Sequence, residues 1–298
     1  MNLKCLLKQE FINKKIDIEE KLIPRGFELC GNVAVIDFSS FAHKKLLMQN
    51  NAELIKKAIS EYLQKINKNI NTILLKKNKL EGEFRLGDYE IIFGKNTECI
   101  YRENNCEFAF DIEKMYFSTK LGSERQILAN SINNGEVILS AFAGVCPYPI
   151  VIAKQKDVKI DAIENNTYCK KYALANIKKN KVEDRVDFYC QDIVDFVKHC
   201  NKKYNRILMT APKINHNFLD LLIQCLDLNK KKTGIINYYC FCKIDKNIDE
   251  TKIILENLEQ KFIEKNLVCS FKNIRKCGNF APYQYRTHIE IDLKKKFV

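Results

Sequence analysis

The sequence predicts an α/β protein in which a doubly wound sheet follows a smaller α+β domain. After Gly135, short apolar strands alternate with helical segments up to a closing strand over 284–293. Before that point, strand-like runs separated by Gly and Asn turns accompany one amphipathic helix. We therefore expect an N-terminal extension over 1–22, a small α+β domain over 23–115 and the doubly wound domain over 116–298.

The small domain is expected to hold one helix and several short strands. Residues 28–38 form a β-type run, and Ser39 and Ser40 after it are candidate helix caps. Apolar residues then recur at helical spacing over 54–66. Strand-like segments follow around 71–77, 88–95 and 107–112, which together describe a compact α+β domain.

The second domain reads as a regular alternation of strands and helices. Its expected strands are 136–144, 158–164, 186–192, 204–212, 233–241 and 284–293. Helices are expected between them, one beginning near Pro147 and another running through Ile177. Ligands of such sheets bind at the carboxyl ends of the strands, near the switch in strand order, so the site is expected there.

Charge points to a polyanionic partner. Lys and Arg number 50 against 37 Asp and Glu, a net charge of +13, and such an excess favours nucleic acid through counterion release. The alternative, that the lysines only solvate the surface of a chain with biased composition, stays open on these numbers. No long apolar run or leader-like start occurs, so we expect a cytoplasmic protein that does not bind membranes.

The cysteines do not indicate disulfides or a metal site. The 13 cysteines are scattered without a C-x-x-C pair, which is typical of reduced, mostly buried thiols. Cys240 and Cys242 form a C-x-C, but no second pair stands at zinc-finger spacing. We therefore expect no metal.

The first strand of the second domain ends in a turn, "FAGVCPYPI", with the character of a cofactor site. Gly144 allows a close approach of the backbone to a ligand. Glu164, at the end of the next strand, is placed to accept hydrogen bonds from ribose hydroxyls, and Asp192, after the third, from an adenine amino group. This order is that of a class I S-adenosylmethionine site. A single glycine is a weak signal, however, and Ser140 and Cys146 stand where an acid and a second glycine are usual.

Longer segments carry a family resemblance. They are "EGEFRLGDYEIIFG", "YRENNCEFAFDIEKMYFSTKLGSERQILA", "GEVILSAFAGVCPYPIVIAK", "RILMTAPKINHNFLD" and "GIINYY". In order and spacing they resemble the archaeal and eukaryotic tRNA guanine-37 N1-methyltransferases and the related wyosine-pathway enzymes, over about 23–293. The resemblance implies a class I (Rossmann-like) S-adenosylmethionine-dependent methyltransferase domain preceded by a small, RNA-facing α+β domain. It also implies methylation of N1 of guanosine 37 in the anticodon loop.

The resemblance assigns roles to individual residues. Because guanine N1 carries a proton, its methylation needs a general base, and Glu124 matches the family's base. Arg85 matches the arginine that stabilises negative charge on O6. The residues that match cofactor-binding positions are Tyr116, Phe142, Gly144, Val145, Glu164, Asp192 and Pro212. Those that match tRNA-binding positions are Lys120, Arg125 and Thr210.

Two departures affect the tRNA-binding positions. Thr210 stands where the family has an asparagine, and a hydroxyl lacks the paired donor and acceptor of an amide. Lys120 replaces an arginine, which keeps the charge but loses the bidentate fork. Further candidates for phosphate contacts are Lys76, Lys77, Lys79, Arg85 and Arg102. About 20 residues precede the matching segments, fewer than an additional N-terminal domain needs, so we expect recognition mainly of the anticodon stem-loop. The resemblance also implies a monomer.

Two alternative functions stay open. One is a wyosine-pathway enzyme that transfers a methyl or an aminocarboxypropyl group to modified guanosine 37. The segment "FSTKLGSER" resembles the methyltransferase branch more, because the aminocarboxypropyl branch tends to carry a Gly-Asn pair there. The other is a tRNA-binding relative without catalysis, which Ser140, Cys146 and Thr210 favour.

Overall fold

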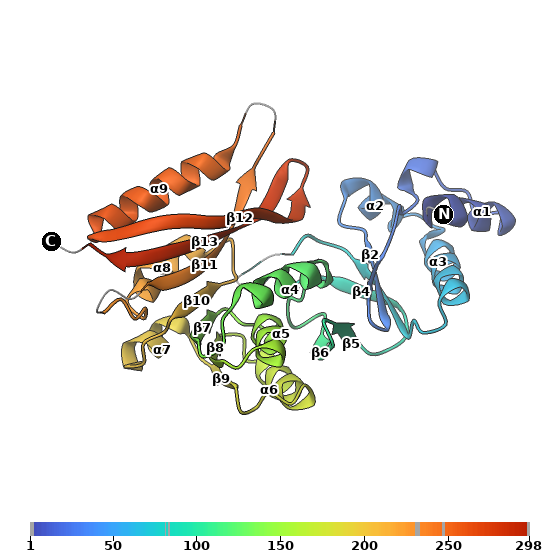
Figure 1. Cartoon of the computed structure of the whole chain (residues 1–298). Coiled ribbons are helices and arrows are strands. Elements are labelled where there is room, and N and C mark those ends of the chain that lie inside the picture. Colours follow the sequence, from blue (N-terminus) through green and yellow to red (C-terminus); the bar gives the residue numbers. More distant parts are fainter. Residues whose placement is uncertain (1–2, 81, 83, 230–232, 246–247, 297–298) are drawn as a thin grey trace. The chain divides into compact units, whose positions relative to one another are not determined.

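The computed structural model describes residues 3–80, 82, 84–229, 233–245 and 248–296 (Figure 1). The chain divides into two compact units, Met1–Phe117 and Ser118–Val298, each with its own sheet and core. This division lies close to the expected boundary between 115 and 116.

Unit 1 is built around a four-stranded sheet in the order β1-β2-β3-β4. Its strands are β1 (Glu28–Cys30), β2 (Val33–Asp37), β3 (Thr72–Lys76) and β4 (Tyr89–Phe93). Its helices are α1 (Leu3–Asn13), the 3-10 turn η1 (Glu20–Leu22), α2 (Phe41–Leu46) and α3 (Ala52–Ile66). Strands β2 and β3 are parallel, as the intervening helices require, and β5 (Glu98–Glu103) pairs with β6 (Cys106–Asp111) as a separate hairpin.

Two expectations for unit 1 need correction. The run 28–38 is two antiparallel strands, because the chain reverses at Gly31, where φ is +58° and a β-carbon would lie 1.9 Å from the carbonyl oxygen of Ile100. Residues 1–22 are also more than an extension, since α1 buries Leu3, Leu7 and Phe11 in the core of unit 1. The capping prediction is confirmed at Ser40, whose Oγ accepts from the His43 amide at 3.2 Å.

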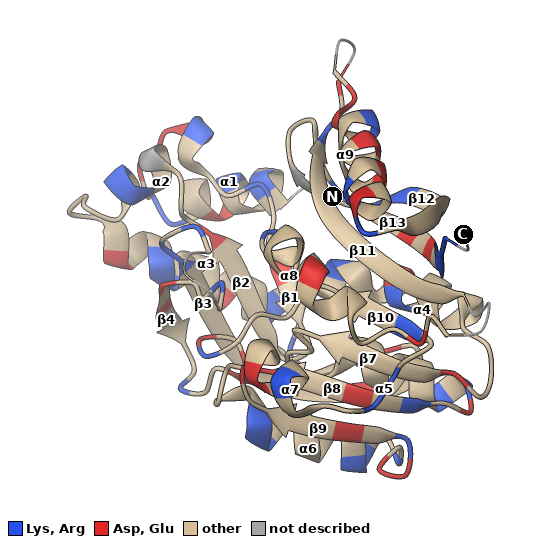
Figure 2. Cartoon of the chain, turned by 90° about the vertical axis from the view of Figure 1, so that its left-hand side faces the viewer, with Lys and Arg blue, Asp and Glu red and all other residues tan. Residues whose placement is uncertain are grey.

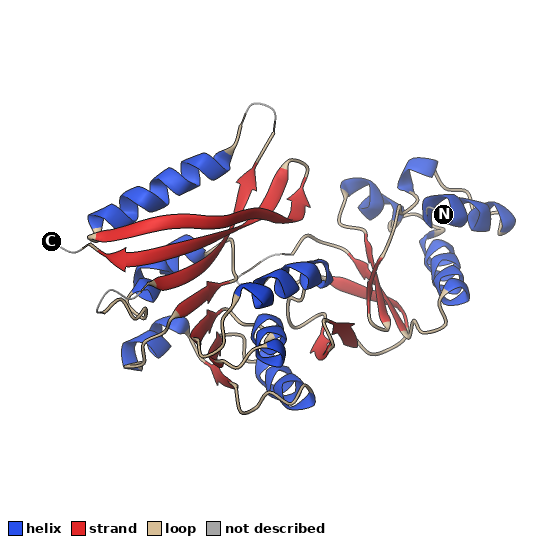
Figure 3. Cartoon of the chain, in the orientation of Figure 1, coloured by secondary structure: helices blue, strands red, loops and turns tan. Residues whose placement is uncertain are grey.

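Unit 2 is a seven-stranded sheet in the order β12-β13-β11-β10-β7-β8-β9 (Figure 3). Its strands are β7 (Val137–Ala141), β8 (Lys159–Glu164), β9 (Val186–Cys190), β10 (Arg206–Met209), β11 (Gly234–Lys243), β12 (Leu267–Ala281) and β13 (Gln284–Lys295). The first five are parallel and β13 is antiparallel to both β11 and β12. The strand order reverses between β7 and β10, whose ends pair Ala141 with Met209. The class I prediction for the fold is therefore confirmed, and the expected ligand site corresponds to this reversal in strand order.

The helices of unit 2 cover the sheet. They are the 3-10 turn η2 (Thr119–Leu121), α4 (Gly122–Ser131), α5 (Pro147–Gln155), α6 (Cys169–Lys179), α7 (Ile193–His199), α8 (Asn215–Ile223) and α9 (Glu250–Glu264). Apolar residues of α7, α8 and α9 share one core with the sheet, for example Phe196, Leu222 and Phe262. None of the helices in the described part of the chain combines the length and hydropathy that a membrane span requires.

Candidate active site

The turn after β7 adopts an unusual backbone. Phe142, Gly144 and Cys146 have φ of +59°, +57° and +64°, in the left-handed region. Cys146 directly precedes α5, and its side chain is fully buried. A glycine would adopt this left-handed conformation with less strain. A β-carbon on Gly144 would meet no atom within 4 Å among the described residues. The turn therefore leaves open space beside Gly144, as a ligand that approaches the backbone requires.

Two carboxylates accompany this turn. Glu164 ends β8, and its Oε2 accepts from the Gly144 amide at 2.7 Å while its Oε1 accepts from the Asn166 amide at 2.8 Å. Asp192 caps α7 through a 2.7 Å bond from the Val194 amide. The two acids thus fix the loops after β8 and β9.

The residues that follow β10 also contact this turn. Thr210 Oγ1 lies 3.2 Å from the carbonyl oxygens of both Ala141 and Phe142, so its proton is engaged by the turn. The Thr210 hydroxyl can offer a substrate only its oxygen as an acceptor. Pro212 follows in the loop before α8, whose Phe218 ring packs edge-on against Phe142 at 5.2 Å. Val145 is buried, and the buried hydroxyl of Ser140 has no hydrogen-bond partner among the described residues.

Glu124 lies in the first turn of α4 and is only 4% exposed. The sequence places it at a helix N-terminus, but its partners come from the sheet. Tyr239 Oη of β11 donates to Oε1 at 2.6 Å. Arg275 of β12 forms a bidentate ion pair, with Nε 2.9 Å from Oε2 and Nη2 2.7 Å from Oε1. The carboxylate is therefore held by two side chains that sequence reasoning missed.

The ionisable side chains around Glu124 have shifted pKa values. Burial, and then the nearby Tyr148 and Glu124, raise the pKa of Tyr239 well above its usual value, so this hydroxyl stays protonated as a donor. Burial and Glu124 also raise the pKa of Cys277 to about 12. Burial opposes the charge of Arg275, but the hydrogen bonds to Glu124 raise its pKa overall. The guanidinium is thus a permanent cation beside the carboxylate.

Arg85 and Tyr116 come together in unit 1. The guanidinium carbon of Arg85 lies 4.0 Å from the centre of the Tyr116 ring. Arg85 has a φ of +54°, which is rare outside glycine, and its buried Nε has no hydrogen-bond partner among the described residues. This strained residue therefore keeps a donor that a ligand could use.

Several of the candidate phosphate contacts form ion pairs within unit 1. Lys76 pairs with Asp37, Lys77 with Asp88 and Arg102 with Glu107. Lys120 is exposed on η2. The prediction for Arg125 is wrong as stated, because this side chain is 1% exposed and its Nη2 donates to the Ser118 carbonyl at 2.9 Å. Its guanidinium supports the start of α4 instead of facing solvent.

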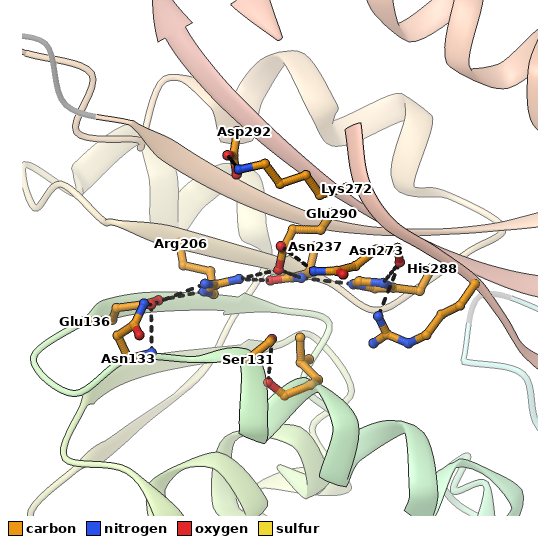
Figure 4. A network of polar contacts seen from close by, with 12 residues as sticks. Ser131, Asn133, Glu136, Arg206, Asn237, Lys272, Asn273, His288, Glu290 and Asp292 are labelled. Carbon is orange, nitrogen blue, oxygen red and sulfur yellow. Dashed lines mark hydrogen bonds and ion pairs between the residues drawn. The ribbon is translucent and has the colours of Figure 1, made fainter. Parts of the chain in front are cut away.

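A buried polar network crosses the sheet beside this site (Figure 4). Arg206 of β10 donates to Glu136 at 2.6 Å and to Glu290 at 3.2 Å. The chain of contacts continues through Asn237 to His288, and from His288 to the carbonyl of Asn273 at 3.1 Å. Since that carbonyl can only accept, His288 carries its proton on Nδ1 and accepts on Nε2. Burial, followed by the charge of Arg275, lowers the pKa of His288 to about 4.

The cysteines of β11 stand apart from this chemistry. The sulfurs of Cys240 and Cys242 lie 3.5 Å apart. No group of three or more metal-ligating side chains comes together among the residues that the structure describes.

Known proteins resemble the chain along nearly its whole length. Residues 99–268 match the TRM5/TYW2 methyltransferase domain, and residues 8–97 match the TYW2 N-terminal domain. The chain is 32% identical to tRNA (guanine(37)-N(1))-methyltransferase Trm5b of Pyrococcus abyssi, over 97% of this chain and 80% of that protein. It is 30% identical to a tRNA(Phe) (4-demethylwyosine(37)-C(7)) aminocarboxypropyltransferase of Methanocaldococcus jannaschii, over 81% of this chain and 94% of that protein. The crystal structure of Pyrococcus abyssi Trm5b superposes with a TM-score of 0.75 at 30% identity, covering 93% of this chain and 78% of the other.

Proposed function

The chain belongs to the TRM5/TYW2 family of methyltransferases, and from this premise we propose that it methylates N1 of guanosine 37 in tRNA with S-adenosylmethionine. The observation that carries the proposal is the buried carboxylate of Glu124, bound by the guanidinium of Arg275 and the hydroxyl of Tyr239. Methylation of a protonated ring nitrogen needs such a proton acceptor.

The residues of the turn fit the cofactor. Gly144 has open space beside it, and Glu164 and Asp192 at the ends of β8 and β9 are carboxylates, the acceptor type that ribose hydroxyls and an adenine amino group require. When bound, S-adenosylmethionine supplies a methyl group on a positively charged sulfur, which becomes a neutral thioether as the methyl group is taken up by guanine N1. Glu124 accepts the N1 proton, and Arg85 stabilises the charge that builds up on O6.

The basic surface supports tRNA as the partner. Helix α6 carries Lys170, Lys171, Lys178 and Lys179 and no acidic residue, and these lysines are exposed (Figure 2). Helix α9 shows the opposite balance, with more acidic than basic side chains. The net charge of +13 is therefore unevenly distributed between these helices, as expected of a protein that binds a polyanion with one of its faces.

The test uses two labels in the cofactor. Purified protein is incubated with a tRNA transcript carrying guanosine 37 and with S-adenosylmethionine labelled either in the methyl group or in the aminocarboxypropyl chain. We expect only the methyl label in the product, identified as 1-methylguanosine by nucleoside mass spectrometry. Glu124→Ala should lose this product, whereas Glu183→Gln, which removes an exposed acid of the same unit, should keep it.

A second candidate function is transfer of the aminocarboxypropyl group. The match of residues 8–97 to the TYW2 N-terminal domain and the aminocarboxypropyltransferase relative favour it. Incorporation of the chain label into tRNA that carries 4-demethylwyosine, with none of the methyl label on guanosine 37, would replace the main proposal by this one. Binding of tRNA without transfer of either label would instead indicate a relative without catalysis.

A further inference from the structure

Glu124 has unequal oxygens. Oε1 accepts two hydrogen bonds, from Tyr239 Oη and from Arg275 Nη2. Among the described residues, Oε2 accepts one, from Arg275 Nε. Since a carboxylate oxygen offers about two acceptor positions, Oε1 is saturated and Oε2 keeps one position open.

Arg275 reaches Glu124 from a distorted part of β12. The pairing of β12 with β13 shifts register between Lys272 and Arg275, and Asn273 within this bulge has a φ of +48°. A bulge bends its strand and redirects the neighbouring side chains. The backbone carbonyl of Asn273 then accepts from Arg275 Nη1 at 3.3 Å, and the side-chain Nδ2 of Asn273 donates to Glu290 Oε1 at 2.9 Å. The guanidinium is thus held on two sides, by Glu124 through Nε and Nη2 and by the Asn273 carbonyl through Nη1.

A buried carboxylate without a cation prefers its neutral form, in which it cannot take up a proton. Glu124 is 4% exposed, so the charged side chains around it are its immediate surroundings in place of water. The titratable and charged side chains that interact with Glu124 or its direct partners are Arg125 on α4, Tyr148 on α5, Tyr239 on β11, Arg275 and Cys277 on β12, and Arg286 and His288 on β13. Of these, Arg275 makes the direct ion pair with the carboxylate.

We infer that Arg275 is a positioning residue for the general base, which orients the Glu124 carboxylate through its bidentate contact and leaves Oε2 to accept the incoming proton. This inference rests on the proposed function and adds to it the atom that reacts and the side chain that prepares it. As N1 of guanine takes up the methyl group, its proton passes to Oε2. Glu124 becomes a neutral carboxylic acid that still accepts from Arg275 and Tyr239.

The experiment compares three substitutions at the site with one control. Arg275→Met removes the charge, Arg275→Lys keeps a charge without the fork, and Tyr239→Phe removes one donor from Oε1. Lys272→Met, on the same strand, removes an exposed lysine that pairs with Asp292. For each variant, single-turnover methyl transfer is measured between pH 5.5 and 9, per folded molecule, together with the affinities for S-adenosylmethionine and tRNA.

We expect Arg275→Met to lower the rate at neutral pH by roughly 10- to 100-fold, the range seen when the partner that orients a functional side chain is removed. The acidic limb of its pH profile should move to higher pH, because the carboxylate then ionises later. Arg275→Lys should bring this limb back towards that of the unsubstituted protein, and Tyr239→Phe should reduce the rate less. Both affinities and the Lys272→Met profile should stay within about threefold of the starting values.

A second readout needs no turnover. The ionisation of Glu124 is followed by infrared difference spectroscopy of the carboxyl band, with Glu124→Gln as the blank, and should also move to higher pH in Arg275→Met. An unchanged carboxyl titration and an unchanged pH profile in this variant would overturn the inference and leave only a structural ion pair. If the protein makes no methylguanosine although the carboxyl titration moves, the proposed function fails while the effect of Arg275 on Glu124 stands.

Discussion

At the scale of single residues, the cofactor turn shows how a site tolerates departures from its usual sequence. Cys146 occupies a left-handed conformation that favours glycine, and full burial of its small side chain accompanies that strain. Thr210 replaces an amide, but its hydroxyl links the ends of β7 and β10 through the carbonyls of Ala141 and Phe142. Both residues therefore contribute to the shape of the turn.

Gly144→Ala tests whether the space beside the turn holds the cofactor. The left-handed φ of +57° makes the alanine cost about 1–2 kcal/mol of stability, and its methyl group would occupy the ligand's space. We expect the affinity for S-adenosylmethionine, measured by calorimetry, to fall about tenfold or more, which corresponds to at least ~1.4 kcal/mol.

Gly135→Ala is the matched control for this measurement. Its φ of +83° is also positive and its β-carbon would also meet nothing within 4 Å, but it precedes β7 at the opposite end of the strand. Equal losses of cofactor affinity in the two variants would refute a ligand site at the turn.

At the scale of elements, sequence patterns predicted strands whose signal lies within a short stretch of the chain, but not contacts between distant residues. Four of the parallel strands of unit 2, β7, β8, β10 and β11, are apolar runs with most residues buried, so their positions could be predicted. The long strand β12 was missed, because Lys272, Asn273 and Arg275 interrupt its pattern at a bulge. The partners of Glu124 were also beyond prediction, since Arg275 lies 151 residues away and only the sheet order brings it near.

Arg206 holds together four strands of that sheet. Its side chain is 2% exposed and pairs with Glu136 and Glu290. Arg206→Met would leave two carboxylates buried without their cation, so we expect a loss of about 3–5 kcal/mol in the free energy of unfolding by urea.

The exposed pair between Lys198 and Asp195 provides the comparison. Its side chains are 61% and 65% exposed, so Lys198→Met should cost less than about 1 kcal/mol. Similar losses in the two variants would show that the Arg206 network adds nothing beyond a surface ion pair.

His288 makes the stability of the sheet depend on pH. Its pKa is lowered to about 4 by burial and by Arg275, so the unfolded chain binds a proton below about pH 6.5 while the folded protein does not. Stability should therefore be fully present above about pH 6.5 and fall as the pH drops towards 4.

Urea unfolding at pH 7.5 and pH 5 measures this contribution. We expect the difference between the two pH values to shrink in His288→Gln and to persist in His199→Gln, which alters an exposed histidine of α7. An equal pH difference in all three proteins would mean that His288 does not resist protonation. His43, whose pKa burial also lowers, accounts for part of the remaining difference.

At the scale of the whole molecule, the candidate residues fall in two units. Arg85 and Tyr116 belong to unit 1, whereas Glu124, the turn after β7 and its two acids belong to unit 2. A monomeric, cytoplasmic protein stays a prediction from the sequence.

The uneven charge leads to a prediction about salt. Lys170→Gln with Lys178→Gln removes two charges from the basic helix α6. If these lysines contact phosphates, tRNA should bind more weakly, and the slope of log affinity against log salt should become shallower by about 1 for each contact. Filter binding at several salt concentrations measures the slope.

Lys252→Gln with Lys261→Gln removes the same charge from the acidic helix α9. This variant should bind tRNA with the original slope. A loss that is equal in both variants would mean that only the net charge matters, and no change in either would exclude α6 from the tRNA-binding face.

The place of β13 in the sheet has a consequence for biosynthesis. This strand lies between β11 and β12 although it is made after both of them, so the growing chain leaves β11 as an open edge until the hairpin inserts. Translation at about 5–20 residues per second adds the 151 positions between Glu124 and Arg275 in about 10–30 seconds. During that interval the nascent chain carries its central acid without its cation. Unit 2 therefore reaches its final sheet only after residue 295 has left the ribosome. Strand β13 then joins β12, which carries Arg275, to β11, which carries Tyr239.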